Sequence, residues 1–402
     1  MRHRVVITAM GIMSSLGNDP EKILENFRSG KTQFKRSQLD PDVVVCPVEN
    51  FDLKAAIGRC KNRRYLNRGA AFSVAAALTA VKNSALTKED LSNAGLMVGT
   101  GPNLDMDADF CRDRTGRIEW PGAPALWMLK FIANTPAALI SQLTGIKGES
   151  LSIQTACTAG LQAVGEAFRK IKDGYLQLAL AGAGDSRLSF TAIMAYKKAR
   201  ALFSGKGAAD RACRPFDQTR HGFVCGEGGA FFLLESIEHA HRRKAPILAE
   251  IKGYGAGMDA HSMTAPKPDG ESAQKAVCAA LREADLTASD IAMVSAHGTG
   301  TKANDAMEVK VIERIFGSST PPIMALKSWT GHLSAACGAI ELGLTLISLE
   351  NNFWPPIRNL TDPMSREINF IQKYLNLPAE TILLQNFGFG GQNCALVIQK
   401  AT

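Results

Sequence analysis

The sequence lacks most of the patterns by which metal and redox sites are recognised. Its 402 residues include nine cysteines at irregular spacing, with no Cys-x-x-Cys pair and no His-Glu-x-x-His. These absences argue against a zinc ribbon, an iron–sulfur site, a disulfide framework and a zinc-protease helix. We therefore expect a reducing, cytoplasmic location and a chemistry that needs no metal and no bound cofactor.

Long apolar runs and aromatic residues are also scarce. No stretch approaches 18 consecutive apolar residues, so no membrane-spanning helix is predicted. Aromatic residues make up 7% of the chain and hardly interleave with the basic ones, which disfavours a platform for single-stranded nucleic acid. Polar residues interrupt the N-terminal run Val5–Leu16, which we expect to be a strand entering a loop rather than a signal peptide.

Positive charge is in excess. With 46 basic and 38 acidic residues the formal net charge is +8. An acidic partner would explain this excess, and an ordinary basic surface explains it equally well. The densest basic run consists of Lys61, Arg63, Arg64 and Arg68, and it leads into an alanine-rich helix predicted over residues 70–83.

Strand-like and helix-like runs alternate from end to end, a pattern typical of an α/β protein. Apolar residues at three- and four-residue spacing predict a helix over residues 158–173, which Gly174 stops. A second series of such units begins near Ile247, and residues 381–398 predict a closing hairpin. The sequence thus predicts two similar α/β halves, residues 1–246 and 247–402, sharing a large interface.

Cys157 is the candidate nucleophile. It lies in the segment Ser152–Gly160, between a predicted strand and the helix over residues 158–173. A free thiol with a pKa of about 8.5 is mostly un-ionised at neutral pH, and the N-terminus of a helix favours the thiolate. Small neighbours such as Ala156 and Gly160 allow a tight turn and close approach of a substrate. The ordinary alternative is a buried structural thiol.

Two histidines follow predicted strands. His297 ends a strand predicted over residues 291–296 and opens the sequence His-Gly-Thr-Gly-Thr. Residues at the carboxyl ends of strands commonly face ligands, although a structural histidine that bonds a turn would fit equally well. His332 opens a helix predicted over residues 333–350, whose N-terminus would disfavour the imidazolium and favour a neutral N–H donor.

A lysine completes this set of polar residues. Lys327 follows a predicted apolar strand over residues 323–326. A buried lysine requires an acidic partner, for which Glu308 and Asp305 are the candidates.

Four motifs, in this order, give the chain a resemblance. Thr-Ala-Cys-Thr-Ala-Gly, His-Gly-Thr-Gly-Thr, Lys-Ser-x-x-Gly-His and Asn-Phe-Gly-Phe-Gly-Gly-x-Asn resemble those of the elongating β-ketoacyl-acyl-carrier-protein synthases, the ketoacyl synthase II type of the thiolase superfamily. The resemblance extends over nearly the whole chain. It implies a thiolase-like fold, in which two similar α/β halves form a five-layered αβαβα arrangement, and a dimer.

The resemblance also implies a role for each matching residue. Cys157 would carry the acyl chain as a thioester, while His297 and His332 would bind the thioester carbonyl of a malonyl donor. Lys327 would lie behind the histidines, paired with Glu308. The backbone N–H groups of Cys157 and Phe389 would form the oxyanion hole, and Phe389 would gate the acyl pocket. The channel for the phosphopantetheine arm would be lined by Thr264, Thr299 and Thr301.

The implied reaction is the decarboxylative Claisen condensation of a Cys157-bound acyl chain with a malonyl group on acyl carrier protein, in fatty-acid or polyketide-type elongation. Such a carrier is acidic, and the basic run 61–68 is its candidate docking site. A thioester hydrolase or acyltransferase would need only Cys157 and His297. A non-catalytic carrier-binding scaffold is a further alternative.

Several positions depart from the family pattern. His221, Lys302 and Gln392 replace the usual acidic residue, proline and threonine, and an acidic stretch, Pro102–Asp109, occupies a region that helps to shape the pocket floor and the dimer contact. These departures favour a specialised substrate or an unlike dimer partner. The alternative function is therefore the catalytic subunit of a heterodimeric ketosynthase/chain-length-factor pair, whereas Cys394 is expected to be structural.

Overall fold

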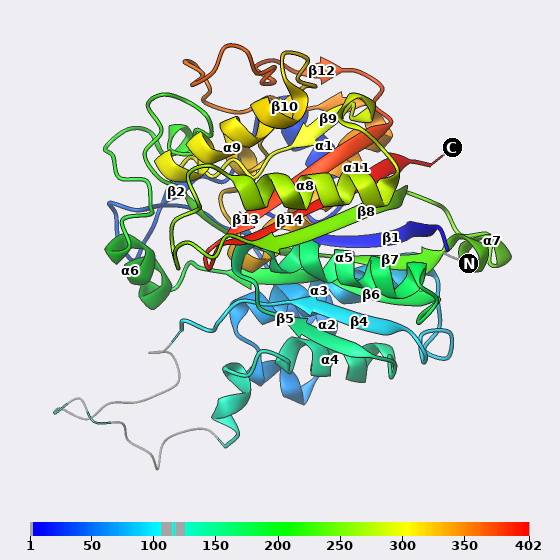
Figure 1. The fold of residues 1–402 in the computed structure, drawn as a ribbon. Coiled ribbons are helices and arrows are strands. Elements are labelled where there is room, and N and C mark those ends of the chain that lie inside the picture. The colour runs from blue at the N-terminus through cyan, green and yellow to red at the C-terminus, as the bar shows by residue number, and fades with distance from the viewer. Residues whose placement is uncertain (1–2, 106–114, 116, 118–124, 402) are drawn as a thin grey trace.

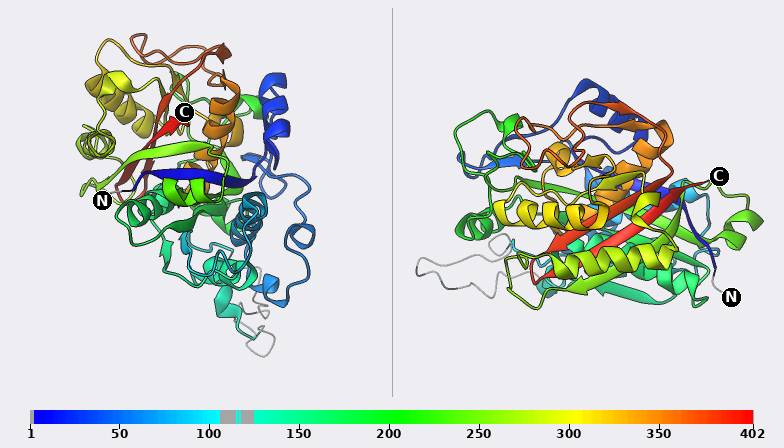
Figure 2. Two further views of the ribbon diagram at one scale, coloured as in Figure 1. Left: turned by 90° about the vertical axis from the view of Figure 1, so that its right-hand side faces the viewer. Right: turned by 45° about the horizontal axis from the view of Figure 1, so that its top comes forward.

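A computed structural model describes residues 3–105, 115, 117 and 125–401 (Figure 1). Its main strands form one continuous path in the order β10-β9-β13-β14-β8-β1-β7-β6-β4-β5. The two halves of this path meet at β1 and β8, which lie side by side (Figure 2). Only Val5, Val6 and Ile7 of β1 pair with β8, so strand pairing between the halves is short.

The N-terminal half combines three parallel strands with two antiparallel ones. β4 pairs in parallel with β5 and β6, and β7 runs antiparallel to both β6 and β1. Two short strands, β2 and β3, extend from β7. The bounds are β1 Val5–Met13, β2 Lys35–Arg36, β3 Val44–Cys46, β4 Gly95–Gly99, β5 Ser150–Ile153, β6 Leu178–Ser186 and β7 Cys225–Ser236.

The C-terminal half repeats this mixture. β9 pairs in parallel with β10 and β13, and β14 runs antiparallel to β13 and β8. A separate two-stranded ribbon joins β11 to β12. The bounds are β8 Ala249–Met258, β9 Met293–Ser295, β10 Ile323–Met324, β11 Phe353–Trp354, β12 Leu375–Asn376, β13 Thr381–Gly388 and β14 Gln392–Lys400.

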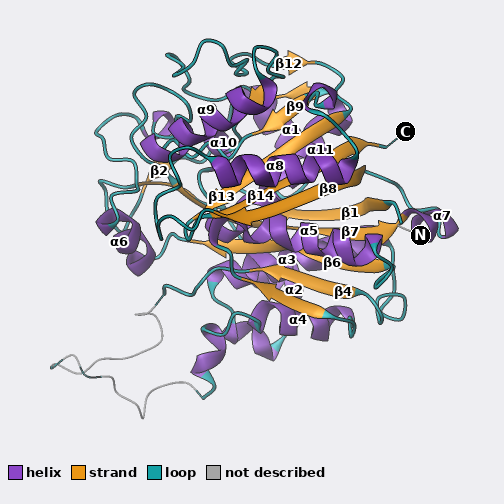
Figure 3. Cartoon of the chain, viewed as in Figure 1, coloured by secondary structure: helices purple, strands orange, loops and turns teal. Residues whose placement is uncertain are grey.

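Helices cover the strands on both faces (Figure 3). α3 packs on β1, β6 and β7, and α8 packs on β8 and β14, so these two helices belong to the outer layers. α5 and α11 pack on each other and on strands of both halves. The bounds are α1 Pro20–Ser29, α2 Leu53–Ile57, α3 Arg68–Ser84, α4 Thr135–Thr144, α5 Ala159–Lys172, α6 Phe190–Lys198, α7 Ile237–Arg242, α8 Glu271–Ala284, α9 Lys302–Phe316, α10 Lys327–Thr330 and α11 Cys337–Asn351.

The core is centred on α5 and α11. Every residue of α11 from Cys337 to Leu349 is buried, as expected for a helix that is apolar all round. Gly165 of α5 admits the ring of Tyr254 from β8, because a Cβ at Gly165 would lie 2.3 Å from that ring. Such close packing ties the halves together where strand pairing is short. The outer helices, the two sets of strands and this central pair make the five predicted layers.

Most elements lie where the sequence predicts them. The helix over residues 158–173 is α5, and the closing hairpin is β13–β14. The largest difference concerns the helix predicted over residues 333–350. A 3-10 turn, Ser334–Ala336, precedes α11, which begins only at Cys337. None of the helices in the described part of the chain has the length and apolar character needed to cross a bilayer.

Candidate active site

Cys157 lies on a tight turn between β5 and α5. A 3-10 turn, Ala156–Thr158, connects the strand to the helix, and Ala156 adopts a positive φ of 51°. This backbone conformation is strained for a residue other than glycine, as at the nucleophile turn of α/β hydrolases. Gly99 of β4 lies against the helix start, since a Cβ there would lie 2.7 Å from Ala159. The turn thus holds Cys157 in a fixed position.

The surroundings of Cys157 favour the protonated thiol over the thiolate. Its side chain is buried, and burial raises its pKa to about 11, although Lys327 and the backbone N–H of Phe389 act in the opposite direction. Burial thus acts against the preference for the thiolate that is expected at a helix N-terminus. Desolvation of the anion outweighs the neighbouring positive charge of Lys327.

His297 is held as a neutral donor. Its Nδ1 accepts hydrogen bonds from Lys327 Nζ at 3.0 Å and from Asn386 Nδ2 at 3.1 Å. With Nδ1 accepting, the ring proton lies on Nε2. Burial and the charge of Lys327 hold the pKa of His297 well below its usual value.

His332 is held in the same tautomer by a different partner. Its Nδ1 accepts from the backbone N–H of Ser334 at 3.0 Å. Burial, followed by Lys327, lowers its pKa to about 3. The imidazole is neutral as predicted, but the cause is burial and a turn rather than the start of α11. The ring centroids of His297 and His332 are 5.8 Å apart, so two N–H donors lie close together.

Lys327 pairs with a different acid from the one the sequence suggested. Its Nζ donates to Glu341 Oε1 at 2.5 Å, and both side chains are almost fully buried. The predicted pairing with Glu308, or with Asp305, is wrong. Glu341 lies on α11 and also accepts from Asn386 Nδ2 at 2.7 Å. One buried carboxylate thus orients both of the groups that donate to His297.

Glu308 and Asp305 hold the backbone of the His-Gly-Thr-Gly-Thr turn. Glu308 accepts from the N–H groups of His297 at 2.6 Å and Gly298 at 2.8 Å, and burial raises its pKa to about 7. Asp305 accepts from the N–H of Gly300 at 3.2 Å. Both residues therefore support the site through the main chain rather than through Lys327.

Phe389 lies at the tip of the β13–β14 hairpin, next to Cys157. A Cβ at the preceding Gly388 would lie 3.1 Å from the backbone nitrogen of Cys157. The ring of Phe389 is 39% exposed. The backbone of Gly388 and Phe389 therefore lies close to that of Cys157, where the expected oxyanion hole would form.

A cavity of about 550 Å³ leads to these groups. It is lined by Cys157, His297, His332 and Phe389, together with the three predicted channel residues Thr264, Thr299 and Thr301. His221 and Lys302, two of the departures from the family pattern, also line it. The structure thus brings the predicted nucleophile, the two histidines and the three threonines to one cavity.

The basic run 61–68 is divided by the structure. Lys61, Arg63 and Arg64 lie on a 3-10 turn, Lys61–Tyr65, with Lys61 and Arg64 exposed. Arg68 instead forms two hydrogen bonds to the buried Glu227, of 2.7 and 2.6 Å. Its guanidinium therefore stabilises the fold and is a weaker docking candidate than its three neighbours.

The chain matches two sequence-family models. The pattern described as "Beta-ketoacyl synthase, N-terminal domain" covers residues 2–240, and "Beta-ketoacyl synthase, C-terminal domain" covers residues 248–361.

The chain belongs to the β-ketoacyl synthase family.

Individual relatives of this β-ketoacyl synthase span its full length. A Vibrio harveyi protein named 3-oxoacyl-(acyl-carrier-protein) synthase 2 is 32% identical over 413 residues, which cover 99% of each chain. A protein of the same name from Staphylococcus aureus strain N315 is 32% identical over 412 residues, which cover 99% of this chain and 98% of the relative.

Solved structures agree with the fold. A β-ketoacyl synthase from Burkholderia phymatum STM815 superposes with a TM-score of 0.90 at 30% identity, over the whole of both chains. The structure titled "the ishigamide ketosynthase/chain length factor" gives a TM-score of 0.87 at 26% identity, again over both whole chains. These comparisons place the described strands and helices in the thiolase-like fold of the ketosynthases.

Glu341, Asn386 and Ser334 are site residues of this β-ketoacyl synthase that sequence reasoning missed. Ser334 carried no signal, because its contribution is a backbone N–H. Glu341 did carry a sequence signal, because it is the one charged residue in the mostly apolar stretch Cys337–Leu349. Among the described residues no cluster of histidine, cysteine and carboxylate side chains could hold a metal ion.

The neutral histidines give the synthase a predicted pH dependence of stability. His332 has a native pKa of about 3, whereas an unfolded histidine titrates at about 6.5. Between these values the unfolded chain binds a proton that the native chain does not, so the free energy of unfolding falls as the pH falls, by up to about 1.4 kcal/mol per pH unit. Urea unfolding at pH 7 and pH 5 should show a smaller loss for His332→Asn than for the wild type. Equal losses would mean that His332 is protonated in the native state.

Proposed function

We propose that this protein is an elongating β-ketoacyl-acyl-carrier-protein synthase, which condenses a Cys157-bound acyl group with a malonyl thioester. One observation supports this function above all: Cys157 and two neutral histidines line the same cavity. A thioester hydrolase would have no use for the second histidine or for the buried Lys327–Glu341 pair. An inactive scaffold would have no use for the strained turn at Cys157.

In the first half-reaction Cys157 takes the acyl group from its carrier. The sulfur bonds to the thioester carbonyl carbon, and the carbonyl oxygen becomes an oxyanion beside the N–H groups of Cys157 and Phe389. The bond to the pantetheine sulfur then breaks, and the thiol proton ends on that sulfur. One well-placed oxyanion donor lowers such a barrier by about 3 kcal/mol.

In the second half-reaction the malonyl thioester loses carbon dioxide. The electron pair of the breaking carbon–carbon bond forms an enolate, whose oxygen accepts hydrogen bonds from Nε2–H of His297 and His332. The enolate carbon then attacks the acyl carbonyl on Cys157, and the cysteine sulfur leaves and takes up a proton from water. Neutral donors suit this step, because they stabilise the charge that develops without protonating it in advance.

The direct test is intact-mass spectrometry after incubation with acyl carrier proteins that bear different acyl groups. We expect a mass increase equal to one acyl group, located on Cys157 by peptide mapping. An acyl group found on another cysteine would contradict the proposed function.

His332→Ala is expected to slow malonyl decarboxylation at least 100-fold while leaving acylation of Cys157 within about threefold of the wild type. The reason is that His332 donates to the enolate, whereas the oxyanion of acylation is stabilised by backbone N–H groups. Carbon dioxide release and mass gain, measured on the same preparation, separate the two steps. Release of carbon dioxide at the wild-type rate would show that His332 has another role.

We also propose that the acyl carrier protein docks on the basic side chains of the turn Lys61–Tyr65, of which Lys61 and Arg64 are exposed. Arg63→Glu/Arg64→Glu should raise the Michaelis constant for carrier-bound substrate several-fold at low salt, because rim charges act mainly on encounter and are screened by salt. A short pantetheine thioester should be affected less. Arg282→Glu, on the exposed face of α8, is the matched control. An unchanged Michaelis constant would place the docking site elsewhere.

The synthase is proposed to act as a dimer, either with a second copy or with a chain-length-factor-like homologue. The neighbours include a structure titled as a ketosynthase/chain length factor and one titled as a type II PKS acyl-carrier protein in complex with its ketosynthase bound to the hexaketide, at 26% identity each. Of the acidic stretch that suggested an unlike partner, Asp105 is described, and Asp107 and Asp109 lie outside the described residues.

Three further expectations belong to this proposal. The N-terminal half, residues 1–246, supplies the nucleophile, and the C-terminal half, residues 247–402, supplies both histidines. The substrates arrive on phosphopantetheine, and no bound cofactor takes part. A reducing cytoplasm is the expected location, in keeping with the free thiols of all the described cysteines.

A further inference from the structure

A buried arginine lies beside the active site without taking part in the proposed chemistry. Arg187 follows β6, and its side chain is 4% exposed. Its Nη2 donates to Asp185 Oδ2 at 2.9 Å, and its Nη1 donates to the carbonyl of Pro102 at 2.5 Å. Its Nε lies 3.5 Å from Ser334 Oγ. The guanidinium is therefore fixed between the loop that follows β4 and the turn that holds His332.

Tyr196 lies between this arginine and the catalytic histidine His332. Its ring lies 5.3 Å from the ring of Phe223, which lies 4.7 Å from that of His332. Burial raises the pKa of the Tyr196 hydroxyl, and the nearby charge of Arg187 acts in the opposite direction. We call Asp185, Arg187, Tyr196 and Ser334 the polar cluster. It is close to the nucleophile, because the backbone N–H of Ala335 donates to Asp185 Oδ2 at 3.0 Å and the turn Ser334–Ala336 packs against the turn that carries Cys157.

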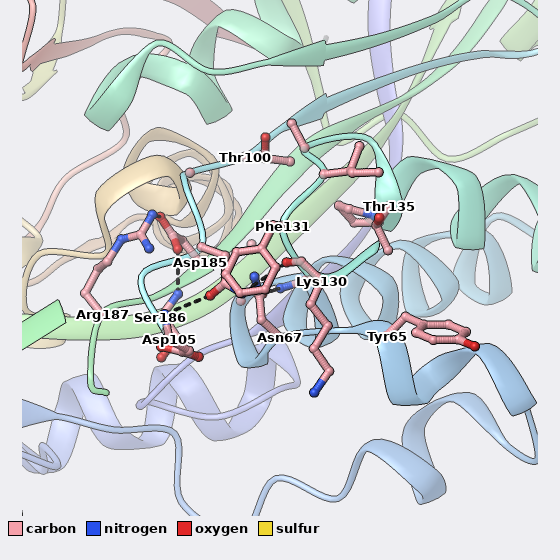
Figure 4. A pocket seen from close by; sticks show the side chains of 18 residues that line it. Tyr65, Asn67, Thr100, Asp105, Lys130, Phe131, Thr135, Asp185, Ser186 and Arg187 are labelled. Carbon is pink, nitrogen blue, oxygen red and sulfur yellow. Dashed lines mark hydrogen bonds and ion pairs between the residues drawn. The ribbon is translucent and has the colours of Figure 1, made fainter. Parts of the chain in front are cut away.

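A second, smaller cavity begins at this polar cluster. It measures about 30 Å³ and is lined by Thr100, Asn103, Lys130, Asp185 and Arg187, among others (Figure 4). This volume suits one or two groups the size of a water molecule. Its lining is rich in hydrogen-bonding side chains, in contrast to the apolar surroundings that a saturated chain prefers.

Thr100 gives the small cavity an unused hydrogen-bonding group. Its side chain is 6% exposed, and its Oγ1 has no hydrogen-bond partner among the described residues. A buried hydroxyl without a partner is costly, by about 1–3 kcal/mol. Thr100 directly follows Gly99, which packs against the first turn of α5. An oxygen atom on a group attached to Cys157 could supply the missing hydrogen bond.

The larger cavity is lined by Thr264, Thr299 and Phe389 and takes the pantetheine arm in the proposed function, which leaves the side of Cys157 toward the polar cluster for the acyl group. An alkyl chain that passed the polar cluster would exclude water from Arg187 and Thr100. It has no polar atoms, so it could not replace the hydrogen bonds that water makes to these two side chains. A hydroxyl or keto oxygen would replace them. We propose that the polar cluster makes this enzyme selective for acyl groups that carry hydroxyl or keto oxygens over saturated acyl groups of equal length. This inference rests on the proposed function.

The test compares acyl groups of one length on the full-length enzyme. Hexanoyl, 3-hydroxyhexanoyl and 5-oxohexanoyl pantetheine thioesters are offered separately, and the rate of Cys157 acylation is followed by intact mass. We expect at least one oxygenated group to load tenfold or more faster than hexanoyl in kcat/KM, and Arg187→Met to bring this ratio close to one. Equal loading of the three groups by the wild type would overturn the inference. No acylation by any of them would instead refute the proposed function.

Two further variants distinguish a loss of selectivity from a loss of the folded structure. Arg187→Met alone leaves Asp185 buried without its partner, so Asp185→Asn/Arg187→Met removes both charges together. Arg243→Met is the matched control, because Arg243 also pairs with a buried acid, Glu235, in a different part of the molecule. We expect the double variant to lose the preference and the control to keep it. A folded double variant that retained the preference would show that the pair is only structural.

Discussion

Cys157→Ser is expected to lower the condensation rate by about 1,000-fold or more, since a serine hydroxyl without a general base is a far weaker nucleophile than a thiol. Neither His297 nor His332 can act as a base for a hydroxyl, because Nδ1 of each accepts hydrogen bonds and Nε2 carries the proton. Condensation is measured as release of the β-ketoacyl product from acyl and malonyl carrier proteins.

The decarboxylation half-reaction separates this effect from a loss of fold. Cys157→Ser keeps both histidine donors, so it should still release carbon dioxide from the malonyl carrier. Cys278→Ser, on the partly exposed side of α8, serves as the cysteine control and should condense normally. Full condensation by Cys157→Ser would remove this residue from the mechanism.

Glu341→Ala is expected to destabilise the protein by about 3–5 kcal/mol and to abolish most decarboxylation, since it leaves the charge of Lys327 buried without a partner. The Lys327–Glu341 pair is almost fully buried, and Glu341 also holds Asn386. Urea unfolding and carbon dioxide release are the two measurements.

A double variant distinguishes stability from positioning. Lys327→Met/Glu341→Leu removes both charges, so it should recover most of the stability lost in Glu341→Ala. It should not recover decarboxylation, because His297 Nδ1 would have lost the Lys327 donor. Recovery of both properties would show that the pair does not orient His297.

Individual elements could be predicted from the sequence because their signals are local, whereas the five-layered arrangement was implied by the resemblance to the β-ketoacyl synthases. The apolar spacing over residues 158–173 predicts α5, and the glycine-rich turn 388–391 predicts the β13–β14 hairpin. The nucleophile and both histidines were readable for the same reason, since each lies beside a strand end and a turn. The structure brings all three to one cavity.

The partner of Lys327 could not be read in this way. Glu308 is close to His297 in sequence, and the structure uses it to bind backbone N–H groups of that turn. Glu341 reaches Lys327 only because α11 is packed between the halves, and the geometry of that layer is not encoded by spacing along the chain. The raised pKa of Cys157 could not be predicted from the sequence for a related reason, because burial depends on neighbours that are remote in sequence.

One strand has consequences for how this enzyme can change. β13 carries Asn386, which donates to His297 Nδ1, and three residues later the chain reaches Phe389, whose N–H faces Cys157. Both half-reactions therefore depend on the position of β13. A substitution that shifts β13 would alter acyl transfer and decarboxylation together, so neither step can be tuned there without affecting the other. A change at Arg187 is coupled to decarboxylation as well, because Arg187 Nε lies 3.5 Å from Ser334 Oγ and the backbone N–H of Ser334 donates to Nδ1 of His332.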